Sequence, residues 1–390
     1  MVENPALAET LRRVGEDGPA YLYETQAEAL AAEVRAAGGV LTADDIRGYA
    51  SREEAPVSAE VMGHRVATAG GSSSGGAVVL GLLGLLGGYA APLASTGADL
   101  YAHRLTEASK HAFALRLNLG DPSFVNCSAA IAALLSAPFM SSLRAATRDD
   151  DVLPLRSYGG AFNLDRPGAG RLPEDHGTTH LSVLDRWGHA VALTSTVNTI
   201  FGSKVMSRST GIVFNNQMDD FSVPGSANYF GLHPSPLNYP EPRKRPLSSM
   251  SPCVVFRPTE GGGEAVRAVG GASGGPRIIT ATAQVLLNLL GKGMGLAEAV
   301  RAPRLHSQLL PDTVFVEDQT LVQSAGGPAG LRIQAGDDVF EALRARGHNT
   351  TDCTGSMGVA QFVAVDPDSG RRWAASDPRK GGQPAREEQP

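Results

Sequence analysis

The chain has 390 residues, of which 42% are hydrophobic and 19% are charged, a balance typical of a globular protein with a sizeable apolar core. Its formal net charge of -6 at pH 7 gives no indication of nucleic-acid binding. The three cysteines, Cys127, Cys253 and Cys353, lie far apart without a metal-binding spacing, so at most one disulfide can form and at least one thiol is free.

The N-terminal part of the chain is predicted to be mainly helical. Residues 1–5 lack the basic region and apolar run of a signal peptide. The most apolar stretch, residues 77–90, is too short to cross a bilayer and predicts a buried helix. Apolar spacing and capping residues predict further helices over 5–15, 21–37, from Thr42 towards Tyr49, 100–118 and 129–146, with two strands around Gly63 within 57–69.

A polar segment with Gly and Pro, residues 148–174, predicts an exposed linker, and a β-hairpin is predicted directly after it. Apolar and polar residues alternate over 178–183, residues 185–188 suit a turn, and 190–197 suit the returning strand. A turn with Gly188 in the left-handed region pairs Asp185 with His189, and this register places Thr178 opposite Thr196 on one face.

Two hydroxyls that meet across a hairpin, behind a Gly-Thr step, indicate a threonine nucleophile. Cleavage between Gly177 and Thr178 would free the α-amine of Thr178, which can act as the base that the hydroxyl needs. The pKa of an α-amine lies near neutrality, at about 7.7–8.0. The alternative is that Thr178 and Thr196 are ordinary strand residues, since threonine is common in strands.

The remainder of the chain predicts strands grouped with helices, and therefore an α+β fold. Residues 222–245 are rich in Pro, Asn, Ser and Gly and predict a long loop of the kind that covers or binds ligands. Strands are predicted over 211–215, 253–257, 264–269, 313–316, 361–365 and 372–375, and helices over 278–290, 296–301 and 339–346.

A second candidate nucleophile is Ser73, because residues 71–75 match the Gly-x-Ser-x-Gly elbow between a strand and a helix. This pattern would make the chain an esterase. The regular strand–helix alternation of that fold is absent, however, and Ser and Gly runs produce the motif by chance. A zinc pair of His176 and His180 is disfavoured, because four-residue spacing brings ligands together on a helix rather than a strand.

Four segments in order resemble the γ-glutamyltranspeptidase (glutathione hydrolase) family: residues 177–183, 215–221, 245–252 and 274–278. The closing residues 376–382 are also similar to the end of that family. The resemblance implies an α+β, four-layer αββα sandwich of the N-terminal-nucleophile hydrolase type, incomplete at its N-terminus. It also implies one precursor cut into a remnant of the large subunit, residues 1–177, and a small catalytic subunit, residues 178–390, which together form one sandwich domain.

The resemblance implies γ-glutamyl transfer and hydrolysis through an ester on Thr178 after autocatalytic cleavage, with no cofactor and no metal. Glutathione and other γ-glutamyl compounds would be the donors, and amino acids, dipeptides or water the acceptors. Thr178 matches the nucleophile, Thr196 its supporting threonine, and Gly274 and Gly275 the oxyanion-binding glycines. The substrate-binding residues that the resemblance implies are Asn198, Gln217 and Asp220 for the α-amine, Ser248 and Ser249 for the α-carboxylate, and Tyr229 in a lid.

The match begins inside the family's large subunit, and the part upstream normally carries a signal or membrane anchor and a carboxylate-binding arginine. The family therefore implies a secreted or membrane-anchored, extracellular protein through a segment absent from this sequence. None of the arginines at 12, 13, 35 and 47 fits the family's arginine motif. The resulting expectation is a reduced activity, and the alternative is a non-catalytic homologue that pairs with another chain.

Overall fold

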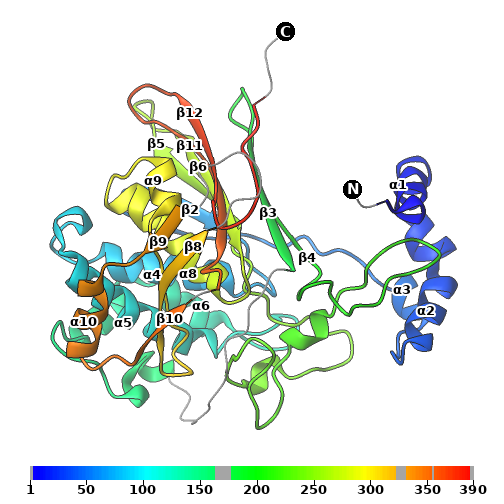
Figure 1. Cartoon of the computed structure of the whole chain (residues 1–390), viewed down its shortest axis with the longest axis horizontal. Coiled ribbons are helices and arrows are strands. Elements are labelled where there is room, and N and C mark those ends of the chain that lie inside the picture. Colours follow the sequence, from blue (N-terminus) through cyan, green and yellow to red (C-terminus); the bar gives the residue numbers. More distant parts are fainter. Residues whose placement is uncertain (1–2, 163–176, 322–330, 354, 387–390) are drawn as a thin grey trace. The chain divides into compact units, whose positions relative to one another are not determined.

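The computed structural model describes residues 3–162, 177–321, 331–353 and 355–386 (Figure 1). The chain divides into two compact units. The first contains residues 1–54 and 196–217, and the second contains residues 55–195 and 218–390.

The first unit consists of helices and of the segment 196–217. Asn4 connects the two, because its Oδ1 accepts from the N–H of Leu7 while its Nδ2 donates to the carbonyl of Gly211 over 2.9 Å. Thr42 and Asp45 form the predicted capping box. The helical elements are α1 (Pro5–Asp17), a π-helical turn (Tyr21–Thr25), α2 (Ala27–Ala36) and α3 (Ala43–Arg47).

Two predictions for the first unit were wrong. The helix expected over 21–37 is interrupted, because its first turn is π-helical and α2 starts only at Ala27. The strand expected over 211–215 is absent from the described structure, which has only an isolated bridge between Met206 and Val213. Gly211 has a φ of 69° and lies against Asn4 and Leu7, so this segment is fixed by a helix start rather than by a neighbouring strand.

The second unit is built on a six-stranded antiparallel sheet with the order β1-β2-β5-β6-β11-β12. The predicted strand pair around Gly63 forms its first two strands. The glycines of β6 let neighbouring side chains approach closely: Gly270 lies under the ring of Phe362. The strands are β1 (Val57–Val61), β2 (His64–Thr68), β5 (Cys253–Pro258), β6 (Glu264–Ser273), β11 (Val359–Val365) and β12 (Arg372–Ser376).

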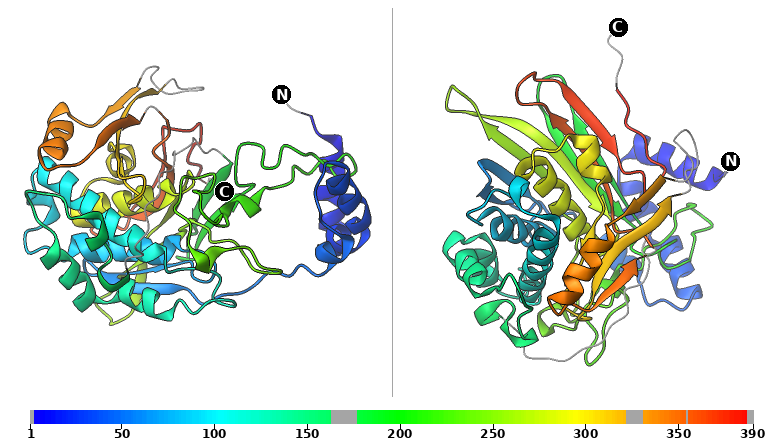
Figure 2. Two further views of the ribbon diagram at one scale, coloured as in Figure 1. Left: turned by 90° about the horizontal axis from the view of Figure 1, so that it is seen from below. Right: turned by 60° about the vertical axis from the view of Figure 1, so that its left-hand side comes forward.

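Different layers cover the two faces of this sheet (Figure 2). On one side lie the largely buried helices α4 (Gly75–Gly87), α5 (Ala98–Arg116) and α8 (Arg277–Leu286), with α9 (Leu296–Arg301). α4 is buried nearly all round, as predicted, because apolar residues occupy all of its faces. On the other side the hairpin of β3 (Thr178–Leu184) and β4 (Ala190–Thr196) packs its β3 strand on β6 and β11. This helix–sheet–hairpin stacking confirms the predicted α+β class.

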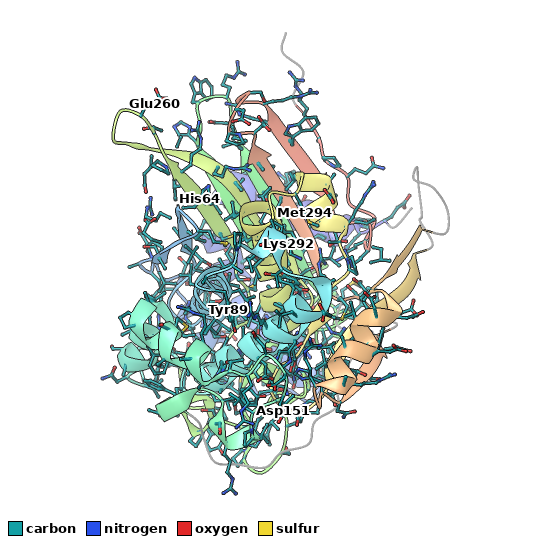
Figure 3. All side chains as sticks on the ribbon, turned by 90° about the vertical axis from the view of Figure 1, so that its left-hand side faces the viewer. His64, Tyr89, Asp151, Glu260, Lys292 and Met294 are labelled. Carbon is teal, nitrogen blue, oxygen red and sulfur yellow. The ribbon has the colours of Figure 1, made fainter. Side chains whose placement is uncertain are left out.

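A smaller sheet completes the second unit. It contains β7 (Leu305–His306), β8 (Val314–Leu321), β9 (Leu331–Gln334) and β10 (Thr350–Cys353), and α10 (Asp337–Ala345) precedes β10. Figure 3 shows Tyr89 and Lys292 on the helical side of the unit and Glu260 in the turn between β5 and β6. The guanidinium of Arg104 lies 4.0 Å from the Tyr89 ring centre, and the half-buried Lys292 lies 3.4 Å from that of Tyr101.

The helix predicted over 129–146 is two helices, α6 (Ser128–Leu135) and α7 (Ala137–Ala146), bent by 74°. Ser136 caps α7 by accepting from the N–H of Phe139, and Pro138 occupies its first turn, so a new helix starts where one was expected to continue. No single helix within the described ranges is long and apolar enough to cross a membrane. Taken together, α6 and α7 reach that length and apolar content, but they are bent at their junction. Cys127, Cys253 and Cys353 are all free and buried.

Candidate active site

The hairpin has the predicted register. The N–H of Asp185 donates to the carbonyl of His189 over 3.0 Å, and Gly188 has a φ of 92° in the turn between them. Further along, Nδ1 of His180 lies 2.8 Å from Oγ1 of Thr194, which is the pairing that this register requires. The same register, continued by two residues along each strand, predicts that Thr178 pairs with Thr196. This pairing stays a prediction.

Thr178 is the first residue of β3, and only 6% of its surface is exposed. Its carbonyl accepts a hydrogen bond from Nζ of Lys380 over 2.9 Å, so the closing motif of the sequence reaches the candidate nucleophile. Gly177, on the other side of the predicted scissile bond, is half-buried. The start of β3 is therefore buried and fixed by a hydrogen bond from the C-terminal segment.

His180 supports the strand rather than a metal. Its ring packs against Gly271 of β6, and its two nitrogens contact the hydroxyls of Thr194 and Ser182. Burial lowers the pKa of His180 to about 4, so the ring is neutral at neutral pH. Its predicted partner in the disfavoured zinc pair, His176, lies outside the described residues. Among the described residues, no group of three or more His, Cys, Asp or Glu could hold a metal ion.

Gly274 and Gly275 form the connection between β6 and α8. Both have positive φ values, 127° and 57°, which favour glycine. Their carbonyls accept from the N–H groups of Arg277 and Ile278 in the first turn of α8. Within the described part of the chain, neither of the two glycine N–H groups donates to another protein group. Two such donors at a helix start are what a developing oxyanion needs.

The Ser248–Ser249 segment is held by the start of α4. Residues 72–74 pair with it: the N–H of Ser74 donates to the carbonyl of Ser248 over 2.9 Å, and the N–H of Ser248 donates to the carbonyl of Ser72 over 3.0 Å. A side chain on Gly75 would collide with the carbonyl of Ser249. The glycine and serines of the elbow-like motif thus allow two backbone segments to approach closely.

The rival nucleophile is part of this support. The hydroxyl of Ser73 donates to the carbonyl of Met250, and no histidine contacts Ser73 among the residues that the structure describes. A serine esterase requires a histidine base beside its nucleophile. The elbow-like sequence therefore serves packing here, and the esterase alternative is not favoured.

A residue that the sequence reasoning missed lies beside the serines. Arg116, the last residue of α5, is 5% exposed and donates from Nη2 to Oγ of Ser249 over 3.1 Å. Burial lowers its pKa to about 10, while the carboxylate of Asp220 acts in the opposite direction. The guanidinium remains charged at neutral pH. A basic residue in the last turn of a helix is so common that its sequence position carried no functional signal.

Asp220 lies at the end of a short 3-10 turn, Gln217–Asp220, and its backbone is fixed by Asn238. Nδ2 of Asn238 donates to the carbonyl of Asp220 over 2.8 Å, while Oδ1 accepts from the N–H of Leu247 over 3.0 Å. One buried amide therefore ties the aspartate segment to the serine segment. Tyr229, from the same long loop, is 45% exposed and stands edge-on to Phe230.

The remaining predicted site residues, Thr196, Asn198 and Gln217, belong to the first unit. Oγ1 of Thr196 accepts from the N–H of Asn198 over 2.7 Å, and Nδ2 of Asn198 donates to the carbonyl of Asn216 over 3.1 Å. Asn198 is buried with a φ of 77°, a conformation that asparagine tolerates better than most residues. The structure thus brings Thr196 and Asn198 together.

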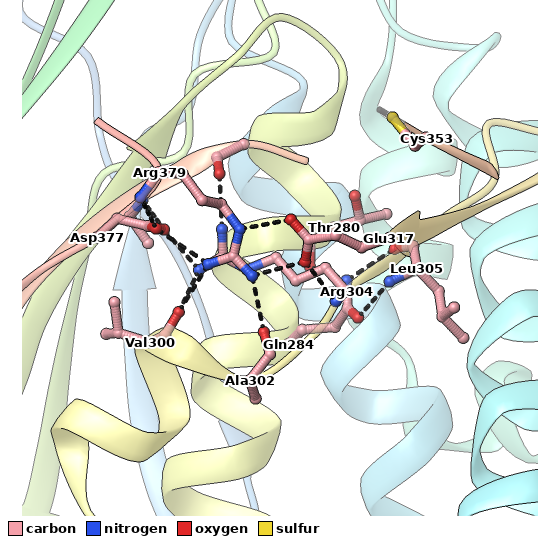
Figure 4. Close-up of polar contacts among 12 residues, drawn as sticks. Thr280, Gln284, Val300, Ala302, Arg304, Leu305, Glu317, Cys353, Asp377 and Arg379 are labelled. Atoms are coloured by element: carbon pink, nitrogen blue, oxygen red, sulfur yellow. Dashed lines mark hydrogen bonds and ion pairs between the residues drawn. The ribbon is translucent and has the colours of Figure 1, made fainter. Parts of the chain in front are cut away.

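A buried charge network anchors the end of the chain (Figure 4). Arg379 forms a two-pronged pair with Glu317 at 2.6 Å and contacts Asp377 at 3.0 Å, and Arg304 contacts Asp377 at 2.8 Å. Arg304 also donates to the carbonyl of Gly358 over 2.7 Å. The Cα of Gly358 is the nearest atom to a side chain built on Gly274, at 3.0 Å. The network therefore supports the glycine turn through Gly358, and Lys380 adjoins the network in sequence.

Acid should weaken this network. Burial alone would raise the pKa of Asp377, but the guanidinium groups of Arg304 and Arg379 outweigh it and hold the pKa below its usual range. A carboxyl with a depressed folded pKa contributes stability above its unfolded pKa of about 3.9, and this contribution is lost as the pH falls through the folded pKa. The melting temperature of the protein should therefore decrease once the pH is lowered below about 4.

Asp377→Asn tests this assignment. It leaves two buried guanidinium groups with less countercharge and should lower the free energy of unfolding by about 3–5 kcal/mol in urea titrations at pH 7. Asp366→Asn, in the β11–β12 turn, is the matched control, because Asp366 bonds only nearby turn groups on the surface. Equal stability of the two variants would show that the network does not anchor the chain.

Comparison with known proteins places the chain. The γ-glutamyltranspeptidase family model matches residues 1–386. Glutathione hydrolase 2 of Arabidopsis thaliana is 37% identical over 98% of this chain and 64% of its own length, and the glutathione hydrolase proenzyme of Escherichia coli is 35% identical over 96% and 60%. This chain thus spans less than two thirds of the length of these relatives.

A solved structure has a similar fold. The cephalosporin acylase from Bacillus halodurans superimposes with a TM-score of 0.77 over 99% of this chain and 63% of its own, at 24% identity. This likeness concerns the fold alone and agrees with the predicted α+β class. The match of the family model over residues 1–386 shows that the chain belongs to the γ-glutamyltranspeptidase family.

Proposed function

We propose that this protein transfers and hydrolyses γ-glutamyl groups, with glutathione as a donor, through an ester on Thr178. The observation that carries the proposal is the position of Thr178 as the buried first residue of β3, with its carbonyl held by Lys380. The relatives named glutathione hydrolase support the donor class. They also favour an enzyme over a non-catalytic homologue.

The first step would be self-cleavage. Oγ1 of Thr178 attacks the carbonyl carbon of Gly177, the peptide C–N bond breaks, and the nitrogen of Thr178 takes the proton as an ester forms. Water then hydrolyses the ester, which returns the hydroxyl and leaves a carboxylate on Gly177. The products are chains 1–177 and 178–390, and the new α-amine of Thr178 becomes available as a base.

Catalysis would reuse the same hydroxyl. The α-amine of Thr178 accepts the hydroxyl proton while Oγ1 attacks the γ-carbonyl of the donor, and the oxyanion accepts hydrogen bonds from the N–H groups of Gly274 and Gly275. The proton passes to the departing amine, and a γ-glutamyl ester remains on Thr178. Water, an amino acid or a dipeptide then takes the γ-glutamyl group, and the threonine is restored.

Donor selection would rest on the charged ends of the γ-glutamyl group. Asp220 suits the α-ammonium, with Asn198 and Gln217 as further proposed contacts, and Ser248 and Ser249 suit the α-carboxylate. Tyr229 would cover the bound donor. Asn238 supports this assignment, because it fixes the Asp220 and Ser248 segments to each other through two hydrogen bonds.

The proposal is tested by incubating the purified chain with L-γ-glutamyl-p-nitroanilide and measuring released nitroaniline, alongside intact mass. We expect turnover together with two polypeptides, the smaller beginning at Thr178. Glutathione should compete with the anilide. A soluble, folded chain that stays uncut and releases no nitroaniline would refute the proposed function.

Asp220→Ala should lower kcat/KM for the anilide by about ten- to hundredfold, because a charge-assisted contact in a partly buried site contributes about 1.5–3 kcal/mol. Asp219→Ala is the matched control, since it removes the neighbouring carboxylate of the same turn. A donor that lacks the α-amine should distinguish the two variants: Asp220→Ala should change its turnover little. Equal losses on both donors would contradict the role of Asp220.

A further inference from the structure

Arg116 is a buried cation whose hydrogen bonds are incomplete. A guanidinium has five N–H donors. Among the described residues, one side-chain acceptor is found for them, Oγ of Ser249 at 3.1 Å, and Nε of Arg116 is buried without a partner. Buried charges are normally paired, since an unpaired one costs several kcal/mol. Arg116 is therefore a buried cation whose hydrogen-bonding groups are satisfied only in part by the residues that the structure describes.

The contact also fixes what Ser249 can do. A guanidinium only donates, so Ser249 accepts from Arg116 and its own hydroxyl hydrogen must point elsewhere. No acceptor for that hydrogen is found within the described ranges. The arginine thus holds the hydroxyl as a donor, and its charge strengthens that donor. A hydroxyl with this polarity is suited to a carboxylate.

The surroundings of Arg116 include several polar side chains. A small pocket beside it is lined by Arg116 itself, by polar residues that include Ser222, Asn228 and Ser235, and by four leucines. The carboxylate of Asp220 acts on Arg116 electrostatically and favours its charged form. An α-amino acid group, with one negative and one positive end, complements this arrangement.

We infer that Arg116 is a positioning residue of the donor site. It orients the hydroxyl of Ser249 towards the α-carboxylate of the γ-glutamyl group and places a positive charge behind that hydroxyl. The inference rests on the proposed function for the identity of the ligand. It assigns the charge of the carboxylate subsite to the C-terminal end of α5.

The central variant is Arg116→Gln, which removes the charge and keeps a side-chain N–H. Two donors separate recognition from folding: L-γ-glutamyl-p-nitroanilide and its analogue with a neutral α-carboxamide. For the carboxylate donor we expect KM to rise about ten- to hundredfold, with kcat within about threefold of the wild type. For the carboxamide donor, kcat/KM should stay within about twofold. Arg116→Lys should recover part of the loss because it restores the charge.

Arg144→Gln is the matched control. Arg144 is likewise an arginine near the end of a helix, although it is half-buried rather than buried, and it donates to the backbone carbonyl of Gly84 over 2.8 Å. Its variant should keep the preference for the carboxylate donor. Combining Arg116→Gln with Ser249→Ala should cost no more than the larger single loss, since Arg116 acts through Ser249. Equal losses of Arg116→Gln on both donors, or additive losses in the double variant, would overturn the inference.

Binding measurements keep this inference separable from the proposed function. Calorimetry with L-glutamate and with its α-amide, isoglutamine, requires no turnover. The wild type should bind L-glutamate at least about tenfold more tightly, and Arg116→Lys should retain part of this preference. A wild type that prefers L-glutamate to isoglutamine but shows no turnover would refute the proposed function and support the carboxylate subsite. A wild type that binds the two ligands equally would overturn the subsite, whether or not Arg116→Gln folds.

Discussion

Thr178→Ala should remain a single polypeptide of 390 residues and should release no nitroaniline from L-γ-glutamyl-p-nitroanilide. The reason is that one hydroxyl is proposed to serve both the cleavage of the chain and the transfer of the γ-glutamyl group, so its removal stops both. The loss of turnover should exceed about a thousandfold, as for other nucleophiles whose function depends on a positioned base. Intact mass and a nitroaniline assay give the two readings.

Two further variants make this expectation specific. Thr178→Ser keeps a hydroxyl and should be cut, more slowly than the wild type. Thr179→Ala is the matched control: Thr179 is the next residue of β3 but is exposed, on the opposite face of the strand from Thr178. It should be cut and active at rates close to the wild type. Cleavage of Thr178→Ala at the same bond would show that another group is the nucleophile.

Gly274→Ala should lower kcat by about a hundredfold, because two constraints meet at this residue. Its φ of 127° is one that residues with a side chain rarely adopt, and a Cβ would lie only 3.0 Å from the Cα of Gly358. Relief of this contact must move the turn that carries the proposed oxyanion donors. A displacement of about 1 Å at such a site is enough for a hundredfold loss.

The control for Gly274→Ala is Gly262→Ala. Gly262 also has a positive φ, 78°, but lies in the β5–β6 turn with open space around its Cα. Its substitution should cost stability through backbone strain, about 1–3 kcal/mol, and leave kcat unchanged. The two variants therefore separate strain from displacement. If Gly274→Ala kept the wild-type kcat and changed only the melting temperature, the glycine turn would have no part in catalysis.

The local sequence patterns predicted most of the elements and the register of the hairpin. Alternation over 178–183 and the turn at Gly188 determine the pairing of Asp185 with His189, because both operate over a few residues. The apolar run of α4 likewise predicts a buried helix. The errors lie where contacts between residues far apart in the sequence determine the local conformation. Residues 211–215 are one example, because Asn4 at the start of α1 fixes them.

The candidate site shows the same division. Motif order singled out Thr178, the serines and the glycines, but it could not find Arg116. That side chain becomes part of the site only because the end of α5 meets Ser249, 133 residues later. The sequence also did not predict that Ser72–Ser74 would bind the backbone of Ser248. The same residues instead suggested the nucleophile motif of an esterase. Spacing along the chain says little about groups that folding brings together over such distances.

The hydrogen bond between Lys380 and the carbonyl of Thr178 has a consequence for the order of events during synthesis. Lys380 is made 202 residues after Thr178. At about 5–20 residues per second, a ribosome needs about 10–40 s to cover that distance. During this interval the Gly177–Thr178 bond already exists, but the residue that holds its threonine does not. The contact between Lys380 and Thr178 can therefore form only after nearly the whole chain has been synthesised.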